Sequence, residues 1–137
     1  MSIRKRARSV STVAAISAAV LAVSAGTASA KPGVPYVRYG ASGLTAYCVQ
    51  TAINHASVNR RTSADIILPD GKFGPATLGA LQQLQRDFNL DPDGVVGPDT
   101  GTVLWQQIDE EIRQNYNWDT GFGAYASYCY YVLPTHS

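Results

Sequence analysis

The stretch DGKFGPAT at residues 70–77 returns 23 residues later as DGVVGPDT at residues 93–100, and both copies read D-G-x-[hydrophobic]-G-P-x-T. An Asp-Gly pair favours a tight turn, because Gly accepts positive φ and the Asp side chain bonds nearby backbone amides. The Pro that follows is pre-set for the first position of a helix, where its missing N–H costs nothing. Each copy therefore predicts a sharp turn that leads directly into a helix.

Apolar residues recur at helical spacing after each copy and also upstream of the first. The three stripes are Ala46, Val49 and Ile53; Leu78, Leu81, Leu84 and Phe88; and Leu104, Ile108 and Ile112. They predict helices that start near Gly43, at Pro75 and at Pro98. Residues 31–40 are expected to form an extended lead-in, residues 55–65 a polar loop, and residues 66–68 a short extended segment over the core. The predicted fold class is mainly α, a compact three-helix bundle with Asp-Gly loops.

Residues 1–30 have the pattern of a secretory signal peptide. A basic start with Arg4, Lys5, Arg6 and Arg8 precedes an apolar stretch at residues 10–23, and Ala28-Ser29-Ala30 supplies a cleavage site. The apolar stretch is shorter than the roughly 20 residues that cross a bilayer. We therefore expect secretion, cleavage before Lys31 and no membrane association afterwards, with residues 31–137 as one domain.

The charge balance changes when the signal peptide is removed. The chain has 11 Lys and Arg and 10 Asp and Glu. Four of the basic residues lie in residues 1–30, so residues 31–137 keep seven basic against ten acidic residues, a net charge of −3. Nucleic-acid-binding domains usually carry a basic face. We therefore expect no nucleic-acid partner.

Two cysteines, Cys48 and Cys129, are present. An even pair in an exported chain indicates one disulfide, and two buried free thiols are the alternative. The segment 115–137 around Cys129 holds seven aromatic residues, too many for a disordered tail. A bridge would strap this C-terminal extension across the first helix, so we expect the extension to be part of the fold.

These residues together resemble the peptidoglycan-binding module appended to many cell-wall hydrolases, the PG-binding-1-like family. The first-helix pattern is matched by Gly40, Gly43, Ala46, Val49, Gln50 and Ile53. The two Asp-Gly elements match at residues 70–90 and 93–104, so the resemblance covers residues 40–105. It implies a three-helix fold and affinity for bacterial peptidoglycan, and it implies no hydrolytic activity.

The chain departs from the family pattern at three places. The segment before Asp70 is longer than usual, and the extension at 115–137 has no counterpart. Gly101 stands where a Trp is common, and we expect Trp105, one turn further on, to fill that space.

The sequence shows no complete set of residues for a metal site, a cofactor site or a glycosidase active site. The loop from Asn89 to Thr100 resembles a calcium loop but ends on Thr where a bidentate Glu is needed. Two His residues cannot supply a three-ligand zinc site once the cysteines are oxidised. The acidic run at 109–111 points in several directions on a helix, whereas glycosidases need two carboxyl groups at a defined separation. We expect no enzyme activity, no metal and no cofactor.

Binding to sugars or stem peptides would use aromatic rings for stacking and polar side chains for hydrogen bonds. For Phe73 and Trp105 a core position is the competing interpretation, and Asp93 also serves the turn. The candidate ligand-binding residues are Lys72, Phe73, Gln85, Arg86, Asp93, Trp105, Trp118 and Tyr128.

The resulting hypothesis is a secreted, non-catalytic module that binds cell-wall peptidoglycan. The alternative is a secreted interaction or inhibitor protein that uses the same fold to bind another protein, which the disulfide and the aromatic extension would suit.

Overall fold

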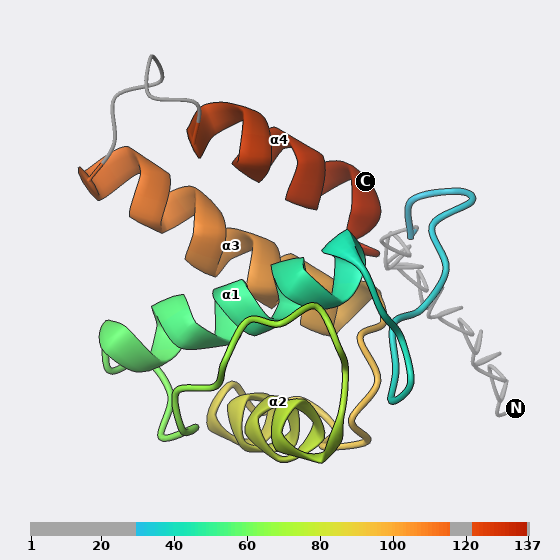
Figure 1. Ribbon diagram of the computed structural model, residues 1–137, viewed down its shortest axis with the longest axis vertical. Helices are drawn as coiled ribbons and strands as arrows, with labels where there is room; N and C mark the ends of the chain where they lie inside the picture. Colours follow the sequence, from blue (N-terminus) through green and yellow to red (C-terminus); the bar gives the residue numbers. More distant parts are fainter. Residues whose placement is uncertain (1–29, 116–121, 137) are drawn as a thin grey trace, which may run out of the picture.

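The computed structural model describes residues 30–115 and 122–136. They contain α1 (Leu44–Val58), α2 (Pro75–Asp87), α3 (Pro98–Asn115) and α4 (Phe122–Val132), drawn in Figure 1. No helix within these ranges is both long and apolar enough to cross a membrane. The mainly helical fold is confirmed, and α2 and α3 begin at the predicted prolines. Residues 1–29 of the predicted signal peptide and Trp118 lie outside the described residues.

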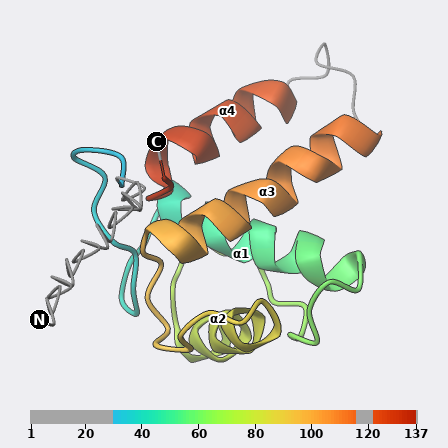
Figure 2. The same cartoon turned by 180° about the vertical axis from the view of Figure 1, so that it is seen from behind.

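Helix α1 is the centre of the fold and contacts each of the other three helices. Figures 1 and 2 show α2 and α4 on opposite sides of the α1–α3 pair. The buried face of α1 is made largely of small residues, including Ala46, Ala52 and Ala56, which let neighbouring elements approach closely. Leu104, Ile108 and Ile112 of α3 are buried as their spacing predicts.

The lead-in before α1 ties the two Asp-Gly turns together. Val37 exchanges backbone hydrogen bonds with Val96 of the second turn, at 3.1 and 2.7 Å. Gly40 N–H donates to the Phe73 carbonyl of the first turn, and Phe73 N–H donates to Ala41, both at 2.9 Å. The predicted extended lead-in therefore serves as a shared edge to which both turns are bonded.

One boundary and one element differ from the sequence expectation. Helix α1 continues to Val58, so the polar residues from His55 onward begin as helix and the loop starts at Asn59. The residues of α4 were expected as part of the fold but not as a helix, and the bundle has four helices within the described ranges. The segment is apolar on all sides, so it has no amphipathic pattern that would mark a helix, and contacts with α1 and α3 stabilise α4.

The predicted disulfide is present between Cys48 of α1 and Cys129 of α4. Both cysteines are fully buried, and their Cα atoms lie 5.6 Å apart. Because the bridge joins residues 81 positions apart, it fixes the C-terminal extension onto the first helix.

Candidate ligand-binding groove

The first Asp-Gly turn is built around the buried side chain of Gln50. Its Nε2 donates to the Asp70 carboxylate at 2.9 Å and to the Thr77 hydroxyl at 3.0 Å. Its Oε1 accepts from Gly71 N–H at 2.8 Å, where φ is +71°. The Asp70 carboxylate also accepts from Lys72 N–H at 2.9 Å. One amide thus satisfies the polar groups at both ends of the octapeptide.

Gln85 repeats this arrangement in the second turn. Its Nε2 donates to Asp93 at 2.9 Å and to Thr100 at 3.1 Å, and its Oε1 accepts from Gly94 N–H at 2.9 Å. The Gln85 side chain is fully buried. Its amide therefore serves the fold, although the sequence made it a ligand-binding candidate.

The hydrogen bonds of the first turn also act on the Asp70 carboxyl. The Gln50 side chain, followed by the Lys72 backbone N–H, lowers the pKa of Asp70 below its ordinary value, since both bonds favour the ionised form. The turn is thus held by a carboxylate that stays charged at neutral pH.

A groove of about 650 Å³ runs between residues 63–68 and α2. One wall carries Ile66 and Leu68, whose side chains are 67% and 78% exposed. Between them Ile67 turns inward, and its backbone N–H and carbonyl bond the Asn54 side chain at 2.9 and 2.7 Å. This alternation places two apolar side chains in solvent at the edge of the groove.

The floor of the groove is formed by the outer face of α2, which carries small side chains. Pro75, Ala76, Gly79 and Ala80 line it. A Cβ atom built on Gly79 would meet no heavy atom within 4 Å. A glycine in the middle of a helix usually has a packing or functional reason, and no neighbouring atom supplies a packing reason here.

Polar groups lie at one end of the groove and just beyond it. The Arg86 guanidinium donates to Gln83 Oε1 from Nε at 3.3 Å and from Nη2 at 2.8 Å. The Asp87 carboxylate accepts from the Thr62 hydroxyl at 2.7 Å and from Ser63 N–H at 2.6 Å. These bonds lower the pKa of Asp87 from 3.8 to about 2, and the bond from Thr62 makes the largest contribution. Asp87 thereby fastens the wall segment to the end of α2.

The predicted ligand-binding residues occupy several different places. Arg86 lines the groove. Lys72 borders one hollow with Tyr47 and another that adjoins the groove at Leu68. Phe73 is 2% exposed and belongs to the core, which was its competing interpretation. Asp93 bonds the second turn from an exposed position.

Trp105 and Tyr128 do not line the groove. They belong to an aromatic face on α3 and α4, defined by Trp105, Tyr128, Tyr130 and Tyr131. Trp105 meets Tyr130 edge-on at 5.1 Å between ring centroids, and Tyr130 meets Tyr131 at 5.6 Å. The Lys31 ammonium lies 3.0 Å from the Tyr130 ring centroid, and partial burial lowers its pKa. Tyr128 is 42% exposed and Tyr131 71%.

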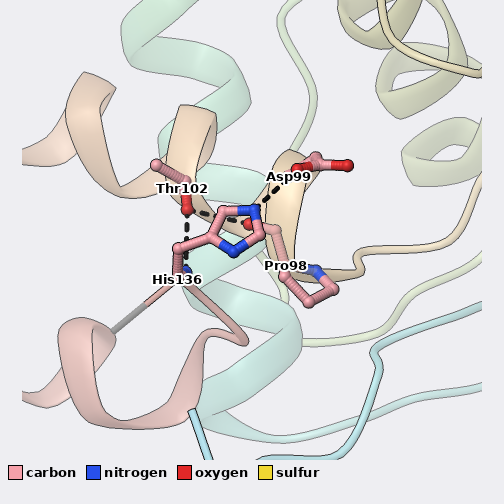
Figure 3. A network of polar contacts seen from close by, with 4 residues as sticks. All are labelled: Pro98, Asp99, Thr102 and His136. Atoms are coloured by element: carbon pink, nitrogen blue, oxygen red, sulfur yellow. Dashed lines mark hydrogen bonds and ion pairs between the residues drawn. The ribbon is translucent and has the colours of Figure 1, made fainter. Parts of the chain in front are cut away.

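The strap, residues 133–136, covers the start of α3. His136 Nε2 lies 2.6 Å from the Asp99 carboxylate, and His136 N–H donates to the Thr102 hydroxyl at 3.0 Å (Figure 3). A Cβ atom on Gly101 would come within 2.0 Å of the Pro134 carbonyl oxygen. The strap therefore occupies the space next to Gly101, which we had expected Trp105 to fill.

Sequence reasoning missed the groove residues other than Arg86. Residues 66–68 were expected to lie over the core, and only Ile67 does so. Gly79 in the middle of an otherwise regular helical stripe was the available signal, because glycine is unfavourable there.

Comparison with known proteins supports the resemblance. Residues 49–104 match a family described as putative peptidoglycan binding domain, so the predicted family is confirmed over that range. An uncharacterized protein in the bpoA1 3' region of Kitasatospora aureofaciens is 47% identical over 45 residues, 33% of this chain and 35% of that protein. A zinc D-Ala-D-Ala carboxypeptidase of Streptomyces albus G is 43% identical over 42 residues, 31% of this chain and 16% of that protein.

The matches thus span about a third and about a sixth of the lengths of these curated relatives. No solved structure matches the chain.

Proposed function

We propose that this chain is a secreted, non-catalytic protein that binds bacterial cell-wall peptidoglycan through the groove between residues 63–68 and α2. The observation that carries the proposal is the family match at residues 49–104. This range contains both Asp-Gly turns, both walls of the groove and all of α2. Secretion rests on the signal-peptide pattern of residues 1–30.

The lining of the groove supports binding without hydrolysis. Among the described residues that line it, Asp65 is the sole carboxylate. Glycoside hydrolysis by the usual mechanism needs two carboxyl groups that flank one bond. Incubation of purified walls with the protein should therefore release no soluble muropeptides, and release above the buffer control would contradict the non-catalytic assignment.

Pull-down with insoluble peptidoglycan tests the binding itself. The protein spanning residues 31–137 should sediment with purified walls at low and at moderate salt. The double variant Ile66→Ser/Leu68→Ser should bind at least about 10-fold more weakly, because removing two exposed apolar contacts costs more than about 1.4 kcal/mol.

Val58→Ser is the matched control for that variant. Val58 is 65% exposed and does not line the groove, so the Val58→Ser variant should bind walls as well as the unchanged protein does. Recovery of the unchanged protein wholly in the supernatant would overturn the proposal. Equal losses from both variants would overturn the assignment to the groove.

The aromatic face supports a second candidate function, contact with another secreted protein. Tyr is enriched at protein interfaces because it combines apolar area with a polar tip. Tyr128→Ser/Tyr131→Ser should leave wall binding unchanged if this face serves a protein partner, and should weaken it if the face stacks on glycan. Lys72 and Asp93 remain predicted contacts outside the groove.

A further inference from the structure

The groove that we propose as the wall-binding site has a lining suited to peptide. Its floor and wall are aliphatic, from Ala76 and Gly79 on α2 to Ile66 and Leu68 opposite. None of the described residues that line it is aromatic. Sugar rings are typically held by stacking on aromatic side chains, and the described aromatic residues lie elsewhere, in the lead-in, in the core and on α1, α3 and α4. Small aliphatic side chains fit such a lining better than a pyranose ring.

The charges at the groove define the ends of its ligand. Arg86 uses two of its N–H donors on Gln83. A guanidinium has five donors in a planar fork that matches a carboxylate, so three lie outside this pair. Asp65 also lines the groove and offers a negative charge for an amine. A short peptide with a free carboxylate and an amine has the complementary charges.

The second repeat shows a peptide segment on the corresponding surface. Because the two octapeptides are offset by 23 residues, Ala76 and Gly79 of α2 correspond to Asp99 and Thr102 of α3. The strap residue His136 contacts both Asp99 and Thr102 (Figure 3). The outer face of α3 is thus covered by a non-helical stretch of the chain, whereas the same face of α2 is open.

We propose that the groove binds the stem-peptide part of peptidoglycan, as an extended peptide with small aliphatic side chains whose terminal carboxylate is held by Arg86. The proposal rests on the proposed wall-binding function and names its ligand class. Gly79 keeps the floor low enough for the peptide to lie against α2. The glycan strand would remain outside the groove.

Titration with synthetic peptides tests this assignment, with the chain of residues 31–137 and heteronuclear NMR as the readout. The probes are a peptide that ends in D-Ala-D-Ala with a free carboxylate, the same peptide amidated, and a chitin oligosaccharide. The free acid should shift amides of residues 63–68 and α2, and the amide form should bind at least about 10-fold more weakly. Equal binding of acid and amide, or shifts from the oligosaccharide alone, would overturn the proposal.

Variants then locate the contact. Arg86→Gln should weaken binding of the free acid about 10-fold or more and remove its advantage over the amide. Arg113→Gln removes one positive charge from an exposed position on α3 that does not line the groove, so its affinity should stay within about twofold of the unchanged protein. Equal losses from the two variants would indicate general charge attraction and would contradict the Arg86 contact.

Gly79 supplies a test that separates binding from folding. Gly79→Ala should raise the Tm by about 4 °C, because alanine favours helix and its Cβ meets open space. Gly79→Leu should abolish peptide binding while the helical circular dichroism is retained. Full peptide affinity in a folded Gly79→Leu variant would overturn the proposal.

A comparison of two wall preparations distinguishes failure of this inference from failure of the proposed function. Intact peptidoglycan and peptidoglycan stripped of stem peptides by an amidase are used side by side. Binding to the intact form alone supports the inference. Equal binding to both would overturn it while leaving wall binding in place, and binding to neither would overturn both proposals.

Discussion

Helices α2 and α3 begin in the same way but differ in what covers them. Each follows an octapeptide whose Asp, Gly and Thr are joined by one buried Gln amide. The outer face of α3 lies under the strap, and its Gly101 has the Pro134 carbonyl against it. The outer face of α2 lines an open groove, and its Gly79 has no neighbour within 4 Å.

This difference distinguishes the residues that build the two turns from the helix surfaces that could bind a ligand. The inward side chains of both turns are committed to hydrogen bonds that are the same in each copy. The outward faces are not fixed by the octapeptide, since the chain covers one and leaves the other open. The residues common to both octapeptides therefore identify the fold. The outer face that differs between α2 and α3 identifies the candidate site.

The disulfide is expected to have the largest effect, because it fastens the cover of α3. Cys48→Ser/Cys129→Ser should lower the free energy of unfolding by about 4 kcal/mol, the value for a closed loop of this length. Urea unfolding of both proteins measures the loss. Amide exchange should increase at the start of α3 and not in α2, and equal changes in the two helices would contradict the role of the strap.

The two Gln amides test whether the turns are equivalent. Gln85→Leu should cost about 3 kcal/mol, because it leaves the buried Gly94 N–H and Thr100 hydroxyl without their partner. Gln50→Leu should cost about 1–2 kcal/mol, since Gly71 is nearer to solvent. Denaturant unfolding of the two variants measures both values. A larger loss of unfolding free energy for Gln50→Leu than for Gln85→Leu would contradict the expected difference between the two turns.

Two glycines at different positions of the repeat, Gly101 beside the strap and Gly79 on the groove, test the covered face against the open one. Gly101→Ala should destabilise the protein by about 2 kcal/mol, because its Cβ displaces the Pro134 carbonyl. Alanine at Gly79 should instead stabilise the protein by about 1 kcal/mol. Thermal unfolding of the two variants gives opposite shifts in Tm. Shifts of the same sign would show that the strap does not restrict Gly101.

The smallest expected effect is the pH dependence at the wall of the groove. Since the pKa of Asp87 is depressed to about 2 in the folded protein, its contribution is present above pH 4 and is lost as pH falls toward 2. Unfolding free energies at about pH 5 and about pH 2.5 should differ less for Asp87→Asn than for the unchanged protein. Asp91→Asn, at an exposed loop position, is the control and should keep the full difference.

Much of the fold could be predicted because its signals are local. Pro75 and Pro98 fix the starts of α2 and α3, and the Asp-Gly pairs require turns just before them. Helix α4 carries no such signal, because its sequence lacks the polar face that marks an amphipathic helix and its position depends on the distant Cys48. The two Gln residues precede their Asp partners by 20 and by 8 positions, so no fixed spacing revealed their common role.

The candidate site was harder to predict than the fold because burial decides which polar residues remain for a ligand. Gln85 and Arg86 are neighbours in sequence, yet one lies in the core and the other lines the groove. Helical geometry turns adjacent residues about 100° apart, and the sequence does not state which direction is inward at a helix end. The exposure of Ile66 and Leu68 follows from the contact between Ile67 and Asn54, which is a tertiary contact.

The contact between the strap and the lead-in has a topological consequence. Ala30 and His136 form an antiparallel bridge, and Lys31 N–H donates to the Thr135 carbonyl at 3.0 Å. The two ends of the described fold therefore meet at one point on its surface. A short linker between them, with new ends opened in the exposed loop at Arg60, would give a circular permutant with the same core. In such a permutant the order of the helices along the chain should change while their arrangement in space stays the same.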